Sequence, residues 1–152
     1  MSDIVRIREL FTEMHAASKY AGHVAIDQVA LQKALMAFMM RNGHTNEGGC
    51  LVTVAERDGV VEGFMVGLLD RIYHIGDKFV ANDVYLYASE RCDPVNVSQM
   101  VDAYITWAID NPRVYEVVLS WSDAIPGAER MAKLFRRKKF RLCGEIWERA
   151  AA

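Results

Sequence analysis

The sequence predicts a mixed α/β domain in which helices flank a mostly antiparallel central sheet. Three observations carry this prediction. Apolar residues recur at helical spacing near the N-terminus, two β-branched runs then meet at an Asp-Gly pair, and helical and strand-like patterns alternate from there to the C-terminus. No internal repeat and no linker rich in Pro, Gly or Ser divides the chain, so we expect a single domain over residues 1–152.

Two helices open the chain. The first is predicted from residue 3 to about residue 17, where apolar residues recur three and four apart: Ile4, Ile7, Leu10, Phe11 and Met14. For the second helix, Asp27 is the predicted N-cap and Asn42-Gly43 the predicted end. The polar segment 41–49, which contains three glycines, is a predicted loop.

Three strands are predicted next. The runs "CLVTVAE" and "VVEGFMVGLL" are joined by Arg57-Asp58-Gly59, and an Asp-Gly turn between two such runs is a strong hairpin signal. After a short loop, "FVANDVYLYA" at residues 79–88 is the third predicted strand.

The remaining elements alternate between helix and strand. A helix is predicted from about Val97 to Ile109, with Asn111-Pro112 stopping it. The segment "VYEVVLSW" (114–121) is a predicted strand, "GAERMAKLFRRKKF" (127–140) a predicted helix, and "RLCGEIWER" (141–149) a predicted last strand.

Composition limits the classes of function. The chain has 152 residues, of which 52% are hydrophobic and 25% charged, and no apolar stretch approaches the roughly 20 residues that a membrane span needs. Charged residues precede any signal-like run at the N-terminus, so we expect a soluble cytoplasmic protein with no membrane partner. The net charge of −2 supplies no basic field for nucleic acid, which argues against that partner too.

The cysteines and histidines indicate neither a disulfide framework nor a metal site. Cys50, Cys92 and Cys143 are odd in number and have no CxxC spacing, so we expect reduced thiols. The 4 histidines are scattered without the spacing of metal ligands.

Five phrases, in this order, resemble a known family: "MHAASKYAGHVAID", "VAERDGVVEGFMVG", "NDVYLYASER", "AYITWA" and "AERMAKLFRRKKFRLCGEIWER". Together they cover nearly the whole chain and resemble the GNAT superfamily of acyl-CoA N-acyltransferases, most nearly its bacteriophage-encoded members. The resemblance implies the GNAT fold, acetyl-CoA as the acyl donor and an amine as the acceptor. A phage origin would place the protein in the host cytoplasm or the virion.

The resemblance also implies where acetyl-CoA binds. The strand residues whose backbone is expected to pair with the pantetheine arm are Leu86, Tyr87 and Ala88. The residues expected at the pyrophosphate are Arg91, Val95, Asn96 and Val97. The physical reason for the second set is that the first N–H groups of a helix lack partners and the helix dipole favours an anion.

This pyrophosphate loop departs from the glycine-rich pattern of the family. Cys92 and Asn96 add side chains to a crowded turn, Pro94 removes an N–H donor, and Asp93 brings a negative charge. A carboxylate a few ångströms from a phosphate costs on the order of 1 kcal/mol at a wet surface. The alternative is that Asp93 as N-cap and Pro94 at the first helical position simply start a helix.

The chemistry that the resemblance implies needs a base and, often, a tyrosine that protonates the leaving thiolate. Phe135 stands at the tyrosine position and has no proton to give, which points towards lost or slow catalysis. Asp83 is the candidate base, with a hydrogen-bonded strand residue as the alternative reading, and Glu62 is a weaker candidate. Tyr85 and Tyr87 alternate with Asp83, so all three are expected to share one face of the strand.

Two functions remain open from the sequence. One is an N-acetyltransferase with an unidentified amine acceptor. The other is a catalytically inactive GNAT-fold interaction or structural protein, such as a phage virion component. Partners expected on either reading are a second copy of the chain or a protein assembly. Met36, Met39 and Met40 on the second helix are expected to fill the core and to form a partly exposed apolar patch, which offers a subunit contact. Ser18, Lys19 and Tyr20 match a family phrase near the acceptor entrance or simply form a turn between helices.

Overall fold

The structure is a computed structural model that describes residues 2–149 of the chain. Residues 1 and 150–152 of the predicted domain lie outside the described part. The elements are α1 (Ser2–Ala16), α2 (Gln28–Met40), β1 (Cys50–Arg57), β2 (Val60–Arg71), β3 (Phe79–Ala88), α3 (Pro94–Ile109), β4 (Val114–Val117) and α4 (Met131–Arg137). Two short 3₁₀ turns, η1 (Ile72–His74) and η2 (Ala128–Arg130), precede β3 and α4.

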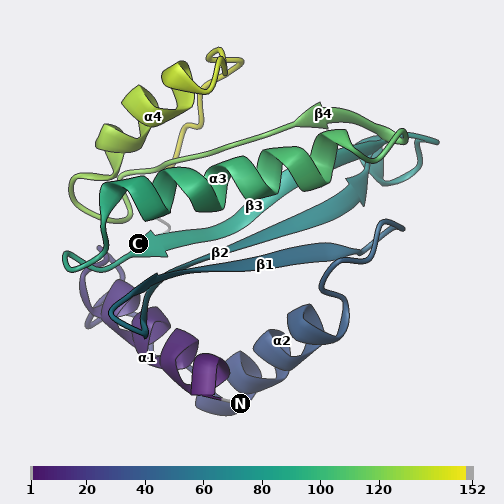
Figure 1. Cartoon of the computed structure of the whole chain (residues 1–152). Coiled ribbons are helices and arrows are strands. Elements are labelled where there is room, and N and C mark those ends of the chain that lie inside the picture. Colours follow the sequence, from purple (N-terminus) through teal and green to yellow (C-terminus); the bar gives the residue numbers. More distant parts are fainter. Residues whose placement is uncertain (1, 150–152) are drawn as a thin grey trace.

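The sheet has the order β1-β2-β3-β4 and is mostly antiparallel, as expected. β1 pairs with β2 and β2 with β3 in antiparallel fashion, whereas β3 and β4 run parallel. Helices α1 and α2 cover one face of the sheet, α3 lies across the other, and α4 lies beyond α3 (Figure 1). No helix in residues 2–149 is both long and apolar enough to cross a membrane.

Each face of the sheet has its own apolar core. On the α1 and α2 side, Leu10, Leu35 and Phe64 belong to one buried cluster. On the α3 side, Tyr104 belongs to the other cluster and packs closely against Gly67, where an added Cβ would lie 2.5 Å from the tyrosine ring. A glycine at this position therefore lets α3 approach the sheet.

The predicted start and turn signals act as expected. The Asp27 carboxylate accepts hydrogen bonds from the N–H groups of Val29 and Ala30, and so caps α2. The β1–β2 hairpin turns at Asp58 and Gly59, which adopt positive φ angles of 54° and 77°.

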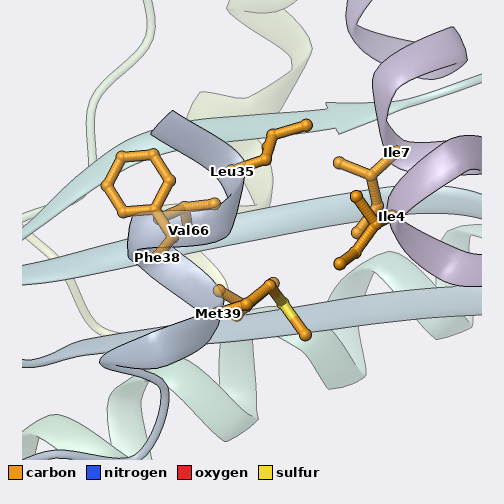
Figure 2. Close-up of a pocket in the computed structure, with 7 residues that line it drawn as sticks. Ile4, Ile7, Leu35, Phe38, Met39 and Val66 are labelled. Carbon is orange, nitrogen blue, oxygen red and sulfur yellow. The ribbon is translucent and has the colours of Figure 1, made fainter. Parts of the chain in front are cut away.

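A small apolar cavity lies between α1, α2 and the sheet. Figure 2 shows Ile4 and Ile7 of α1 facing Leu35, Phe38 and Met39 of α2. The cavity has a volume of about 10 Å³ and is lined by apolar side chains only. It is large enough for about one water molecule, but it offers no polar partner to hold one.

The structure corrects three of the predicted elements. The strand expected over 114–121 ends at Val117, because the chain turns away from β3 there. The helix expected over 127–140 is divided: Gly127 has a φ of 81°, a 3₁₀ turn follows, and α4 ends before Lys139, whose φ is 67°. Residues 141–149 form no strand, since no strand edge pairs with them.

Candidate active site

The site lies where β3 and β4 separate. Their parallel pairing runs from Phe79 opposite Val114 to Ala81 opposite Val117, and one further bond joins Val118 N–H to the Ala81 carbonyl at 2.8 Å. Within the described residues, the backbone of 84–88 makes no hydrogen bond to the chain that follows β4. The two strands therefore form a fork with one unpaired strand edge inside it.

A β-bulge lies at the base of this fork. Tyr85 pairs with Val66 and Asp83 with Gly67, so Val84 is an extra residue in β3. As a result Tyr85 packs against Phe11 on the α1 side, with ring centroids 5.0 Å apart, whereas Asp83 turns to the fork. The prediction that Asp83, Tyr85 and Tyr87 share one face is wrong, because the bulge breaks the alternation of the strand.

Asp83 joins the two arms of the fork through Ser120. Both carboxylate oxygens accept from the Ser120 N–H at 3.0 Å, and the Ser120 hydroxyl donates to Oδ1 at 3.0 Å. Burial raises the pKa of Asp83 to about 6, although the bonds from Ser120 favour the ionised form. This carboxylate can therefore gain and lose a proton near neutral pH.

Tyr104 of α3 supports the same fork. Its hydroxyl donates to the Val118 carbonyl at 2.9 Å, directly after the last strand pair. Burial, together with the negative charge of Asp83, raises the pKa of Tyr104 above its ordinary value, so the phenol stays protonated. Tyr104 and Ser120 are two site residues that the sequence reasoning missed. No local pattern links them to Asp83, because the contact depends on where β4 ends.

The N-terminus of α3 is already capped from within the chain. The Asp93 carboxylate accepts from the Val95 N–H at 2.8 Å, and the Asp93 carbonyl accepts from the N–H groups of Asn96 and Val97 at 2.9 and 3.2 Å. The helix thus begins at Pro94, three residues before the predicted start at Val97. The three N–H groups expected at a pyrophosphate are engaged, and the Asn96 side chain points to β1, where it donates to the Glu56 carbonyl at 2.7 Å.

Arg91 is exposed, and its charge is partly neutralised by Glu62. Arg91 Nε lies 3.2 Å from Glu62 Oε1, while Oε2 of the same carboxylate accepts from Ser89 at 2.6 Å and from Arg6 at 3.2 Å. The hydrogen bond from Ser89 is the main cause of a lowered pKa of Glu62, with the charges of Arg91 and Arg6 adding to it. Glu62 is therefore a buried counter-ion and a poor base, and the network through Arg6 and Ser89 gave no signal in the sequence.

The other predicted site residues lie in two places. Leu86, Tyr87 and Ala88 form the C-terminal end of β3, beside the fork and directly before Ser89. Phe135 is buried in the core on the α3 side, where its ring lies 6.5 Å from that of Phe140.

The turn 18–20 after α1 contacts the loop that follows β4. Lys19 Nζ contacts Asp123 at 2.8 Å and Glu148 at 2.6 Å, and Lys19 N–H donates to the Ala124 carbonyl at 2.8 Å. The bond to Asp123 is the largest cause of a raised pKa of Lys19, so the lysine stays charged. The predicted acceptor-side turn 18–20 therefore lies beside the loop that begins at Ser120. In residues 2–149 no group of three or more His, Cys, Asp or Glu side chains could hold a metal ion.

No protein-family model matches this sequence, and neither does any curated protein sequence. Solved structures do resemble the chain. An acetyltransferase from Trypanosoma brucei has a TM-score of 0.66 and 16% identity, covering 98% of this chain and 93% of that one. A ribosomal-protein-alanine N-acetyltransferase from Brucella melitensis biovar Abortus 2308 has a TM-score of 0.69 and 11% identity, with 99% and 91% covered. The aminoglycoside N-acetyltransferase AAC(6')-Iy, solved in complex with CoA, has a TM-score of 0.67 and 15% identity, with 99% and 90% covered.

These likenesses extend over nearly the full length of both chains, and they confirm the expected GNAT-like mixed α/β fold with its four-stranded mixed sheet. At these identities they show the fold alone. Function has to be argued from the residues at the fork.

Proposed function

We propose that the protein is an N-acetyltransferase that transfers the acetyl group of acetyl-CoA to an amine. The observation that carries the proposal is the fork itself: an unpaired strand edge at 84–88 begins beside Asp83, whose pKa is raised to about 6. An extended amide-bearing arm such as pantetheine can pair with a free strand edge, and a carboxylate with this pKa is suited to accept a proton.

Acetyl-CoA fits one part of the predicted site better than the other. The backbone of Leu86, Tyr87 and Ala88 has an open edge towards the fork, which suits the pantetheine arm. The pyrophosphate end fits poorly. The Asp93 carboxylate already accepts the hydrogen bond of the Val95 N–H, and its negative charge would repel the pyrophosphate. Arg91, the cation that the sequence predicted at the pyrophosphate, is exposed.

In the proposed reaction the bound thioester supplies an activated acetyl group, and Asp83 supplies the base. An amine reacts only after losing its ammonium proton, and ionised Asp83 accepts that proton directly or through one water molecule. Ser120 holds the carboxylate in place through both of its donors. Because Phe135 is buried and has no hydroxyl group, the thiolate has to leave without help from that position.

A second candidate is favoured by the closed N-terminus of α3. If the Asp93 cap excludes the pyrophosphate, the fold serves as an interaction or structural module without turnover. The buried Phe135 supports the same reading.

Calorimetry with acetyl-CoA distinguishes the two. We expect the wild-type chain to bind acetyl-CoA, Arg91→Glu to weaken binding by about tenfold or more through the reversed charge, and Asp83→Asn to leave it within about twofold. Asp93→Ser keeps a capping hydroxyl but removes the charge, so it should tighten binding. Release of free CoA in the presence of a panel of amines then reports turnover, which Asp83→Asn should lower by about 100-fold or more.

Binding that Arg91→Glu leaves unchanged would contradict the predicted pyrophosphate site. No binding by the wild-type chain, together with binding by Asp93→Ser, would replace the enzyme proposal with the second candidate. No binding by either protein would overturn acetyl-CoA as the ligand.

A further inference from the structure

We propose that the free edge of β1 is a strand-binding site and that its occupant is the C-terminal segment 141–149 of a second copy of this chain. We call the space beside this edge the edge groove; it lies between Thr53–Glu56 of β1 and the α3 residues Asn96, Gln99, Met100 and Ala103. The inference concerns the opposite edge of the sheet from the fork and does not depend on the acetyltransferase proposal.

The outer edge of β1 is blocked at both ends and open in the middle. Asn42 Oδ1 accepts from the Val52 N–H at 2.8 Å, and Asn96 Nδ2 donates to the Glu56 carbonyl at 2.7 Å. Alternate residues of a strand present their backbone groups to the same side. The N–H and C=O of Val54 therefore point outwards between the two blocked positions, on the side where the sheet ends.

The edge groove beside Val54 is large and partly polar. It has a volume of about 500 Å³, which gives room for a few residues of extended chain. The hydroxyl of Thr53, which lines the groove, is a buried polar atom without a partner among residues 2–149. An added strand can supply hydrogen bonds to the backbone of Val54 and pack its side chains against α3.

The same chain carries a strand-like segment without an edge. Residues 141–149, "RLCGEIWER", have no regular structure, and Leu142, Ile146 and Trp147 are 84%, 90% and 86% exposed. Large apolar side chains this exposed on one short segment indicate a contact surface. Glu56 is the charged side chain among those that line the described groove, and the segment carries Arg141 and Arg149 beside Glu145 and Glu148, so it can place an arginine next to Glu56 without a net charge of its own.

Segment 141–149 of a second copy suits the groove better than segment 141–149 of the same chain. The Phe140 N–H is bound to the Phe135 carbonyl at 3.0 Å, and Glu148 is bound to Lys19, so both ends of the segment are held near α4 and the fork. β1 and β4 are the two edge strands of the sheet, and α4 lies above α3, away from β1 (Figure 1). Three strand spacings, about 14 Å, separate the β1 edge from β4. Because Asn42 and Asn96 occupy the two ends of the edge, only a few residues from the middle of the segment can pair with β1.

The test is self-association of the full chain, measured by sedimentation equilibrium over a range of concentrations. We expect the wild-type chain to associate. Val54→Pro removes the outward N–H, and the double variant Ile146→Glu with Trp147→Glu removes the apolar side chains; each should weaken association by at least about tenfold. Val54→Thr keeps the N–H and Ile75→Glu changes an exposed apolar residue elsewhere, so both should associate as the wild type does.

Mixing the two defective variants provides a stricter test. The Val54→Pro chain keeps an intact segment and the double variant keeps an intact groove, so the mixture should associate more strongly than either variant alone. A wild-type chain that stays monomeric at every concentration, a defective variant that associates as strongly as the wild type, or a mixture that associates no better than each variant alone would overturn the proposal. If Val54→Pro fails to fold, a fluorescent peptide of residues 140–149 serves as the probe: binding to the double variant supports the site, and no binding overturns it.

Discussion

At the scale of single residues, Glu62 shows how a charge is kept in the interior. Its side chain is 6% exposed, yet Ser89, Arg6 and Arg91 surround its carboxylate. Glu62 is the extra residue of the bulge near the start of β2, and its own carbonyl accepts from the Ser89 N–H at 2.8 Å. These contacts tie α1, β2 and the loop after β3 to one another.

We expect Glu62→Gln to lower the free energy of unfolding by on the order of 2 kcal/mol, because Arg6 loses its buried counter-ion while the hydrogen bond from Ser89 survives. Urea denaturation at pH 7 measures this change. The control is Glu9→Gln, which removes one of the two exposed carboxylate partners of Arg6 and should cost less than about 0.5 kcal/mol. Equal effects of the two substitutions would show that the burial of Glu62 does not matter.

Asp83 should make stability fall as the pH rises. Its carboxyl keeps a proton up to about pH 6 in the folded chain, whereas an unfolded aspartate loses its proton near about pH 3.9. Protonation therefore favours the folded state between these values, and the contribution of Asp83 to the free energy of unfolding declines from about pH 4 to about pH 6.

Asp83→Asn removes this titration. The free energy of unfolding of the wild-type chain, minus that of the variant, should decline from pH 4 to pH 7 in urea denaturation. The difference between the two proteins isolates Asp83 from Glu62 and Asp123, whose pKa values are lowered and which act in the opposite direction at acid pH. A constant difference would mean that Asp83 titrates in the folded chain as it does in the unfolded one.

At the scale of elements, α1 and α2 are held to the sheet by a core that already contains a small cavity. Leu35 of α2 is 4% exposed and lines that cavity with Ile7 and Val66. Leu35→Ala enlarges the cavity, and we expect it to lower the free energy of unfolding by about 2–4 kcal/mol. Val29→Ala on the same helix removes an exposed side chain and should change stability by less than about 0.5 kcal/mol. Thermal unfolding of both variants measures these changes. Similar losses of stability in the two variants would contradict this account of the core.

At the scale of the whole molecule, β2 lies at the centre of both cores. Its residues are buried almost without interruption, and they contact α1 on one face and α3 on the other. The segment 141–149 has no regular structure and lies outside this arrangement.

Amide hydrogen exchange of dilute protein should therefore be slowest in β2 and on the buried side of α3, and fastest in 141–149. The expected order follows from burial and hydrogen bonding of the backbone. Protection of 141–149 in dilute protein, to the level seen in β2, would mean that this segment forms a strand within its own chain.

Sequence and structure agree where the signal is local. The hairpin at Asp58-Gly59, the strand 79–88 and the cap at Asp27 could all be predicted, because turn chemistry and side-chain alternation act within a few residues. Asp93 belongs with them: as an N-cap followed by Pro94, it starts α3 in the way that the alternative reading of the loop described. Of the candidate site, Asp83 is predicted from the family resemblance of its strand, and its role as a base stays a prediction.

The sequence by itself determined the order of the elements as far as α4, the mostly antiparallel sheet and the Asp93 cap that starts α3. Only the tertiary structure decided that β4 leaves β3 after Val117, that a bulge turns Asp83 towards Ser120, and that Glu62 is a counter-ion. The same holds for residues 141–149, whose strand-like pattern finds no partner in the described chain. The physical reason is that a pattern reports what one segment prefers, whereas pairing, burial and pKa values depend on groups far away in the sequence.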